Sequence, residues 1–378
     1  MRYFFHGIRE YFRETDRLLW ISCLLSSVFS CMLVYSAVHR TNPRSFYMQC
    51  IAIALGYAGA VLVSLIDYHR LSKMWPLIAA GGLGLMALTS VMGITVAGTD
   101  DTAWIVIGGV SFQPSELVKI GFLVTLATHL EGLRIHRKMR SFGHICLLLM
   151  HALIPMAIIH IQGDDGAALV FFFIFLTMCF CAGVQLRYFL LVIAGVAAAV
   201  PLAWNFVLNN DQKKRFEILF DHTLDPLGYG YQQGQSEISI GSGQLFGQGW
   251  LQGPRVQASL VPEDHNDFIF SVAGEEFGFA GCMAILLLLT LMMAAVLLIG
   301  IRASDPLGRN ICGGFLGLLA FQSIANIGMC LYVFPVIGIT LPFFSAGGSS
   351  AACLYLGIGL VQGVCRHRKR QTAMIRYG

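Results

Sequence analysis

The chain has 378 residues, of which 56% are hydrophobic and only 12% are charged, with a formal net charge of +4. A soluble domain of this length needs more charge to cover its surface, so the composition excludes an ordinary soluble fold. The positive charge comes with no nucleic-acid recognition motif, and we therefore expect no nucleic-acid partner.

Ten apolar runs follow one another along the sequence, and most of them have the length of about twenty residues that a membrane-crossing helix needs. The fourth run is short and is expected to begin earlier, at Ser115 and Glu116. Because backbone polar groups in lipid have to be paired within their own segment, the predicted fold is an all-α polytopic membrane protein, with residues 1–378 as a single domain. The predicted spans are 18–37, 48–66, 75–96, 117–130, 145–161, 167–184, 188–208, 279–299, 312–334 and 343–364.

The Lys and Arg residues predict the orientation of these spans. With ten spans both termini lie on one side, and that side holds eighteen of the 25 Lys and Arg residues. Positively charged connections favour the cytoplasmic side of a membrane. We therefore expect a multi-pass protein of the cytoplasmic (inner) membrane with both termini in the cytoplasm.

The first unusual polar cluster precedes the fourth span. Pro114 and Ser115 are typical of a helix start, with Ser115 as a plausible N-cap. Glu116 and Lys119 are three residues apart and so share one face of the predicted helix. Ionisable groups at the membrane boundary are costly, which leaves two interpretations: a structural ion pair that anchors the helix, or a functional pair.

The second polar cluster is the outer turn at residues 162–166, which contains Asp164. Turns of acidic residues and glycine are common, so this one alone is weak support for a function. Asp164 gains interest because it is predicted to lie on the same side of the membrane as the other clusters.

A long outer connection follows the seventh span, at about residues 209–267. It mixes Gly, Gln and Ser with apolar residues, which predicts an ordered loop with short helices or re-entrant pieces on the bundle. Lys213, Lys214 and Arg215 open this loop. They could bind a diphosphate, or they could anchor the loop to anionic lipid.

The loop ends at Asp267, immediately before an apolar run. An Asp at a helix start is normally a cap, but Glu275 and Glu276 add further acid at the same membrane mouth. A carboxylate that is half shielded from water there could act as a base. Further along, Pro335, Gly338 and Pro342 break the helix at the outer boundary, which suits either a cavity lining or close helix packing.

Four motifs occur in a fixed order, and together they are specific. They are Phe112-Gln-Pro-Ser-Glu116, the Gly-Tyr-Gln…Gln-Ser…Ile-Gly-Ser-Gly loop, His265-x-Asp-Phe-Ile-Phe270 with Glu275-Glu276, and the final Pro-Phe-Phe-Ser-x-Gly-Gly-Ser-Ser. With these motifs and ten spans, the chain resembles the SEDS family of shape, elongation, division and sporulation proteins along nearly its whole length. That family includes RodA, FtsW and SpoVE.

The resemblance implies a peptidoglycan glycosyltransferase that polymerises lipid II outside the cytoplasmic membrane, with a class B penicillin-binding protein as its transpeptidase partner. It implies that Asp267 is the catalytic residue and that Glu116, Lys119 and Arg215 form the polar site around the substrate. The compact chain favours the RodA-like, cell-elongation branch over division or sporulation. Further substrate-binding candidates in the same clusters are Gln113, Asp164, His265 and Ser345.

One departure from the family pattern concerns positive charge. Family members usually carry Arg directly before the Trp that corresponds to Trp104, whereas Ala103 stands here. Lys213, Lys214 or a divalent cation could supply the missing charge. The sequence names no certain cofactor.

The resulting hypothesis is inverting glycosyl transfer, in which Asp267 takes the proton of the acceptor sugar's 4-hydroxyl and the lipid diphosphate leaves beside Lys119 and Arg215. Two alternatives remain. A flippase for lipid-linked precursors would use the same cavity and cations without a base. A scaffold that only activates a penicillin-binding protein would leave the polar outer cluster unexplained.

Overall fold

The computed structural model describes residues 2–94, 102–108, 110–206, 208–225, 227–228 and 230–377, and these residues are mainly helical. The ends of two predicted spans, at 95–96 and 207, lie outside the described residues. The elements are α1 (Arg2–Glu14), α2 (Arg17–Val38), α3 (Pro43–Leu65), α4 (Tyr68–Lys73), α5 (Trp75–Met92), β1 (Ile105–Ile107), β2 (Val110–Phe112), α6 (Pro114–Ile135), α7 (Phe142–Ile161), α8 (Asp165–Ala182), α9 (Leu186–Phe206), α10 (Asn210–Glu217), α11 (Tyr231–Ser242), α12 (Pro254–Gln257), α13 (Ile269–Ile301), α14 (Pro306–Cys330) and α15 (Gly348–Tyr377).

Nine helices within the described residues are long and apolar enough to cross a membrane. Each coincides with one of the predicted runs. The remaining predicted span, the fourth, is α6, which has 22 residues but carries Glu116, Lys119 and Glu131 along its length. At a rise of about 1.5 Å per residue it is as long as the others. The polytopic all-α fold is therefore confirmed.

The bundle is held together by close helix packing. Helix α15 packs along α3, and α14 packs between α8 and α13. A Cβ at Gly56 of α3 would lie 2.5 Å from the Tyr355 ring of α15, so only a residue without a side chain permits this approach. Small residues at such contacts are the usual means of helix association in lipid, where apolar burial drives it less than in water.

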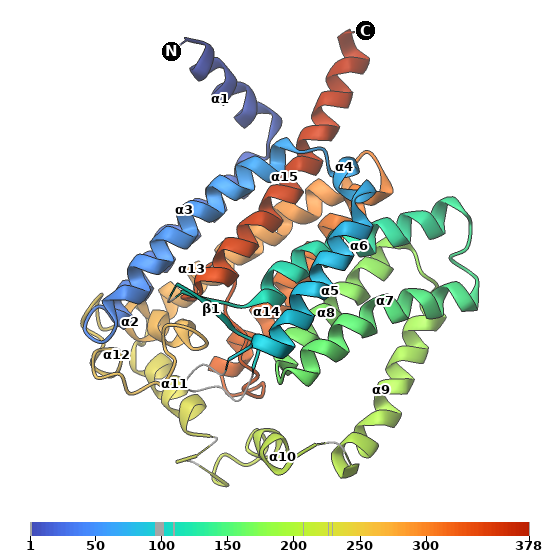
Figure 1. The fold of residues 1–378 in the computed structure, drawn as a ribbon. Helices are drawn as coiled ribbons and strands as arrows, with labels where there is room; N and C mark the ends of the chain where they lie inside the picture. Colours follow the sequence, from blue (N-terminus) through green and yellow to red (C-terminus); the bar gives the residue numbers. More distant parts are fainter. Residues whose placement is uncertain are drawn as a thin grey trace.

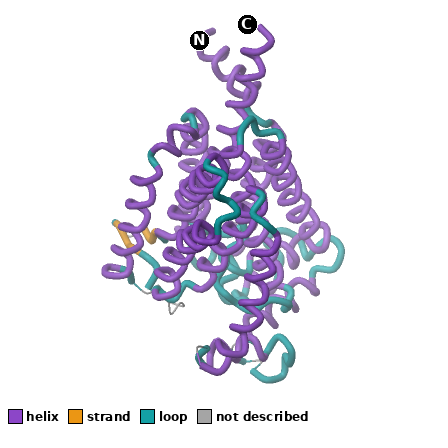
Figure 2. The backbone as a smooth tube through the Cα atoms, turned by 90° about the vertical axis from the view of Figure 1, so that its right-hand side faces the viewer, coloured by secondary structure: helices purple, strands orange, loops and turns teal. Residues whose placement is uncertain are grey.

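The two ends of the bundle differ in construction. Both termini and α4 lie at one end, which we call the terminal end, while α10, α11 and α12 lie at the other, the loop end (Figure 1). Figure 2 shows the same separation after a quarter turn, with the short β1–β2 hairpin at the side of the bundle. The expected short helices in the connection from 209 to 267 are thus present as α10, α11 and α12.

The helix boundaries next to the return of the chain at the loop end differ from the sequence-based prediction. Helix α13 begins at Ile269 rather than near 279, and it breaks at Gly278, whose φ is +65°. Helix α14 ends at Cys330, and α15 begins at Gly348 rather than near 343. Proline and a left-handed glycine interrupt the segment between them, so residues 331–347 cannot continue either helix. We call this irregular stretch the return segment.

The structure places neither Ser115 nor Asp267 at a helix N-cap. The N-cap of α6 is Gln113, so Ser115 lies inside the first turn, where its hydroxyl is buried. The N-cap of α13 is Phe268, so Asp267 lies one residue before the cap. Asp267 thus precedes the cap position of α13, whereas an Asp at a helix start normally occupies it.

Candidate active site

The return segment is the scaffold of the candidate site. Asn326 of α14 donates from Nδ2 to the Ile339 oxygen and to the Asp267 oxygen, both at 2.7 Å. Gln233 of α11, fully buried, donates to the Phe334 oxygen at 2.8 Å. Buried amides of this kind satisfy main-chain carbonyls that no helix can pair. These bonds therefore hold the return segment in one position at the loop end of the bundle, although the segment is irregular.

Asp267 faces this scaffold from the start of α13. Its main-chain oxygen is bound by Asn326, which fixes the backbone, while its side chain is only partly buried. A Cβ placed at Gly338 of the return segment would lie 3.9 Å from Asp267 Oδ2. The carboxylate is thus directed at Gly338 rather than into the helix.

Arg215 reaches the same stretch from α10. This helix begins with a capping box between Asn209 and Gln212, which fixes its first turn. From there Arg215 Nη1 donates to the Val336 oxygen at 3.0 Å. Val336 and Gly338 are two residues apart, so the Arg215 guanidinium and the Asp267 carboxylate both approach the same short stretch of the return segment.

Asp164 and Gln113 join two helix starts behind the return segment. Asp164 Oδ1 accepts from the Ala167 amide at 2.9 Å and so caps α8, while its Oδ2 accepts from Gln113 Nε2 at 2.7 Å. Gly166, in the first turn of α8, leaves no room for a side chain, since a Cβ would lie 2.2 Å from the Ile337 oxygen. The Asp164 turn therefore supports the return segment directly.

Glu116 and Lys119 form the ion pair that their spacing predicted. Lys119 Nζ lies 2.8 Å from Glu116 Oε1, and the exposed fractions of the two side chains are 2% and 8%. Helix α6 packs here against α14 and α15. The pair is enclosed by the bundle, so each charge is neutralised mainly by the other.

His265 fastens the loop to the return segment, and Ser345 braces that segment from within. The His265 oxygen accepts from the Ala346 amide at 2.7 Å, and Ser345 Oγ accepts from the Leu341 amide at 2.8 Å. Burial alone would lower the pKa of His265, but the carboxylates of Asp264, Glu263 and Asp267 outweigh it and raise the pKa above its usual value of 6.5. The imidazole is thus biased towards its charged form beside the candidate base.

The acids after Asp267 have a different role from the one suggested by their position. Glu275 Oε1 accepts from the Arg255 amide at 2.7 Å, and Glu276 Oε1 accepts from Ser36 Oγ at 2.5 Å. Both glutamates are essentially inaccessible to solvent. They hold the α12 region and α2 against α13, so they do not line the membrane mouth as expected.

Sequence reasoning assigned no role to the amides that organise the site. Gln49 of α3 donates to the Ser345 oxygen at 3.1 Å, and Asn326 holds the Asp267 oxygen. A usable signal did exist, because an uncharged amide inside an otherwise apolar span has to find a partner within the bundle.

Comparisons with known proteins agree with this architecture. A family of cell-cycle proteins, FtsW/RodA/SpoVE, matches residues 16–370. The chain is 36% identical over 355 residues to the peptidoglycan glycosyltransferase MrdB of Escherichia coli K12, with 94% of each chain covered. Among solved structures, a chain of a peptidoglycan synthase complex superposes with a TM-score of 0.81 at 32% identity, covering 94% of this chain and 98% of that one. The rod-shape-determining protein RodA of Thermus thermophilus gives 0.70 at 29%, covering 94% and 97%.

Proposed function

The chain belongs to the FtsW/RodA/SpoVE family of cell-cycle proteins, and from this premise we propose that it is a peptidoglycan glycosyltransferase that polymerises lipid II for cell elongation. The observation that carries the proposal is the convergence of Asp267 and Arg215 on positions 336–338 of the return segment. Sugar transfer from a diphosphate carrier requires a base for the attacking hydroxyl and a cation for the leaving diphosphate.

The placement in the membrane follows from the two ends of the bundle. The chain is a multi-pass membrane protein. We assign the terminal end, where the N- and C-termini lie, to the cytoplasm because the positive charges of the sequence gather there. The loop end then faces outward from the cytoplasmic membrane, with residues 1–378 acting as one domain. A polyprenyl-linked sugar at the outer leaflet would contact the protein at the loop end.

In the proposed reaction the Asp267 carboxylate takes the proton of the acceptor sugar's 4-hydroxyl. The oxygen of that hydroxyl attacks the anomeric carbon of the donor and forms the new glycosidic bond with inversion. The bond from the anomeric carbon to the diphosphate breaks, and the polyprenyl diphosphate leaves with the electron pair. Base catalysis of this kind contributes about 10²–10⁴-fold to a rate.

The leaving diphosphate needs positive charge, and we assign its direct contact to Arg215. A guanidinium has five N–H donors, so the same group can hold the Val336 oxygen and also bind an oxygen of the diphosphate. Lys119 would have to leave Glu116 to touch the substrate. We therefore assign it no direct contact with the diphosphate. Gln113, Asp164, His265 and Ser345 position the return segment.

The partner in this proposal is a class B penicillin-binding protein that cross-links the new strand. The support is the fold shared with a chain of a peptidoglycan synthase complex that coordinates polymerization and crosslinking. The likeness to a rod-shape-determining protein supports the elongation branch. Depletion of the protein should then give rounded cells rather than filaments.

The deciding experiment uses the purified full-length protein in detergent with lipid II as its only substrate. The wild type should produce glycan strands, and Asp267→Asn should lower the rate by about 10²–10⁴-fold without changing the midpoint of thermal unfolding. Asp221→Asn is the matched control, because Asp221 lies in the same outer loop, where it accepts from Thr223.

Two outcomes would contradict the proposal at different levels. Strand synthesis by Asp267→Asn at the wild-type rate would remove the base assignment and leave the transferase. A wild type that makes no strands in detergent but moves lipid II across vesicle membranes would instead establish the flippase.

A further inference from the structure

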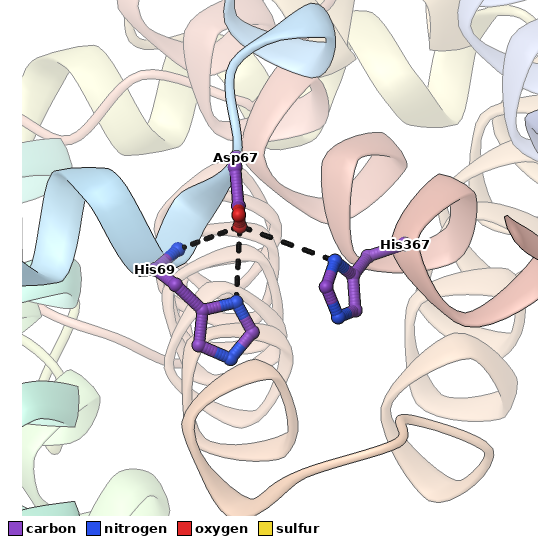
Figure 3. A group of neighbouring side chains, drawn as sticks. All are labelled: Asp67, His69 and His367. Atoms are coloured by element: carbon purple, nitrogen blue, oxygen red, sulfur yellow. Dashed lines mark hydrogen bonds and ion pairs between the residues drawn. The ribbon is translucent and has the colours of Figure 1, made fainter. Parts of the chain in front are cut away.

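A second cluster of chemically versatile side chains lies at the terminal end, far along the bundle from the candidate active site. Asp67, His69 and His367 point towards one another there (Figure 3). Their potential ligand atoms all lie within 4.8 Å of one another. The three residues come from the start of α4 and from α15, which are separated by almost 300 residues of sequence.

The Asp67 carboxylate is the centre of this cluster. Asp67 caps α4, since its Oδ1 accepts from the His69 amide at 3.0 Å, and this bond fixes the carboxylate in place. The Nδ1 atoms of His69 and His367 lie 3.0 and 4.0 Å from the same oxygen. Bonds of about 2.0–2.1 Å to a tetrahedral zinc ion place neighbouring ligands roughly 3.4 Å apart. Small side-chain rotations therefore suffice to surround one ion.

Both imidazoles turn their other nitrogen towards a second polar side chain. His69 Nε2 lies 3.6 Å from Asp305 Oδ2, and His367 Nε2 lies 2.8 Å from the Gln371 amide. A half-turn of that amide lets its oxygen accept the Nε2 proton. Metal-bound histidines usually donate this outer N–H to a carboxylate or carbonyl, which fixes the tautomer that leaves Nδ1 free to bind.

Asp305 is itself held rigidly. Its Oδ1 accepts from the Gly308 amide at 2.9 Å and so caps α14, and its Oδ2 accepts from the Tyr68 hydroxyl. An Asp67–His69 cap explains one local contact in α4. It does not explain why His367, on a different helix, presents Nδ1 to the same carboxylate.

We propose that Asp67, His69 and His367 form a binding site for a divalent transition-metal ion of the zinc class, with water completing the coordination. Two imidazoles and one carboxylate suit such ions better than they suit magnesium or calcium, which prefer oxygen ligands alone. The exposed fractions of the side chains are 41% for Asp67, 35% for His69 and 27% for His367, so an ion can enter from solvent.

The bound ion would fasten α15 to α4. Helix α15 is already tied to the N-terminal segment on another side, where Arg366 pairs with Glu14 at 2.9 Å. A metal at His367 would add a second, removable tie to the connection between α3 and α5. The consequence is a terminal end whose rigidity depends on free metal at the cytoplasmic side.

The test uses untagged full-length protein in detergent, stripped of metal with a chelator and titrated with zinc chloride against a chromogenic zinc chelator. The wild type should take up one zinc ion per chain. His69→Ala and His367→Ala should each weaken binding by at least a hundredfold. His144→Ala is the matched control and should bind as the wild type does, because His144 is an exposed histidine paired with Ser141 at the start of α7.

Two further variants separate metal binding from a structural role of the histidines. His367→Cys supplies another zinc ligand and should keep one-to-one binding, while Asp305→Asn should weaken it by about 10–100-fold. Zinc should also raise the midpoint of thermal unfolding in the wild type and His144→Ala but not in His69→Ala. If the stripped wild type shows no saturable one-to-one binding, or the histidine variants bind zinc unchanged, the proposal is wrong.

Discussion

Asp267 and Glu116 are two acids near the loop end that the fold treats in opposite ways. For Glu116 the side chain is bound, by Lys119 at 2.8 Å, and both partners are enclosed by helices. For Asp267 the main chain is bound, by Asn326 at 2.7 Å, and the half-buried side chain is directed at the return segment. The first arrangement holds a helix in place, whereas the second holds a reactive group at a fixed position without enclosing it.

This difference predicts that the enclosed pair matters most for stability. Lys119→Met leaves the Glu116 carboxylate buried without its partner, and breaking a buried ion pair in this way costs about 3–5 kcal/mol. We expect a large fall in the midpoint of thermal unfolding in detergent, larger than for any other variant proposed for this site. Asp267→Asn serves as the reference, since it should leave that midpoint unchanged.

The double variant sharpens the same point. Glu116→Gln with Lys119→Met removes both charges, so it should recover most of the stability that either single change loses. A single Lys119→Met variant as stable as the wild type would show that the pair is not the anchor of α6.

The next largest effect is expected at Gly166, which links the Asp164 turn to the return segment. In Gly166→Ala the new methyl group would lie 2.2 Å from the Ile337 oxygen, and overpacking of this kind costs about 1–3 kcal/mol. Because Ile337 lies between the contacts of Arg215 and Asp267, we expect strand synthesis to fall by roughly tenfold or more. The measurement is the initial rate of lipid II polymerisation.

Gly132→Ala is the matched control for this change. Gly132 is also helical, in α6, but a Cβ there meets no heavy atom within 4 Å. It should retain both rate and stability. Equal rates for the two variants would mean that the return segment does not have to hold its position for catalysis.

The sequence predicted the bundle well because membrane crossing is a local property. A run of about twenty apolar residues identifies a span without knowledge of its neighbours. The boundary of α13 was missed for the opposite reason. Glu275 and Glu276 interrupt the apolar run, and their partners, the Arg255 amide and Ser36, are tertiary contacts that no local pattern reveals.

The site was predictable as a set of residues but not as an arrangement. Gln113 and Asp164 were both candidates, yet the bond between them joins α6 to α8 and depends on how these helices pack. Likewise, Pro335, Gly338 and Pro342 indicated a break between the last two spans. The role of the return segment as the common support of Arg215 and Asp267 depends on Asn326 and Gln233, whose bonding partners are set by tertiary packing.

A smaller effect is expected from Arg215, which contributes both a hydrogen bond and a charge. Arg215→Ala removes the donor to the Val336 oxygen, worth about 1 kcal/mol, and with it the cation assigned to the leaving diphosphate. We expect a several-fold loss in kcat/KM for lipid II. Arg215→Lys keeps the charge and should recover part of this loss, whereas Lys213→Ala, on the same helix, should change it little. Full activity of Arg215→Ala would assign the diphosphate contact to another group.

The smallest expected effect is a pH dependence that links His265 to the acids around Asp267. The pKa of His265 is raised in the folded protein above its usual 6.5, so folding binds the proton more tightly than the unfolded chain does. The stabilisation is therefore complete below about pH 6.5 and is lost as the pH rises through the higher folded-state pKa. Thermal unfolding of the wild type from pH 6 upward should show this loss, His265→Gln should remove it, and Asp264→Asn should reduce it. Identical curves for wild type and His265→Gln would show that the imidazole does not sense the charge of the Asp267 carboxylate. The difference between Asp267 and Glu116 would then not extend to the neighbouring His265.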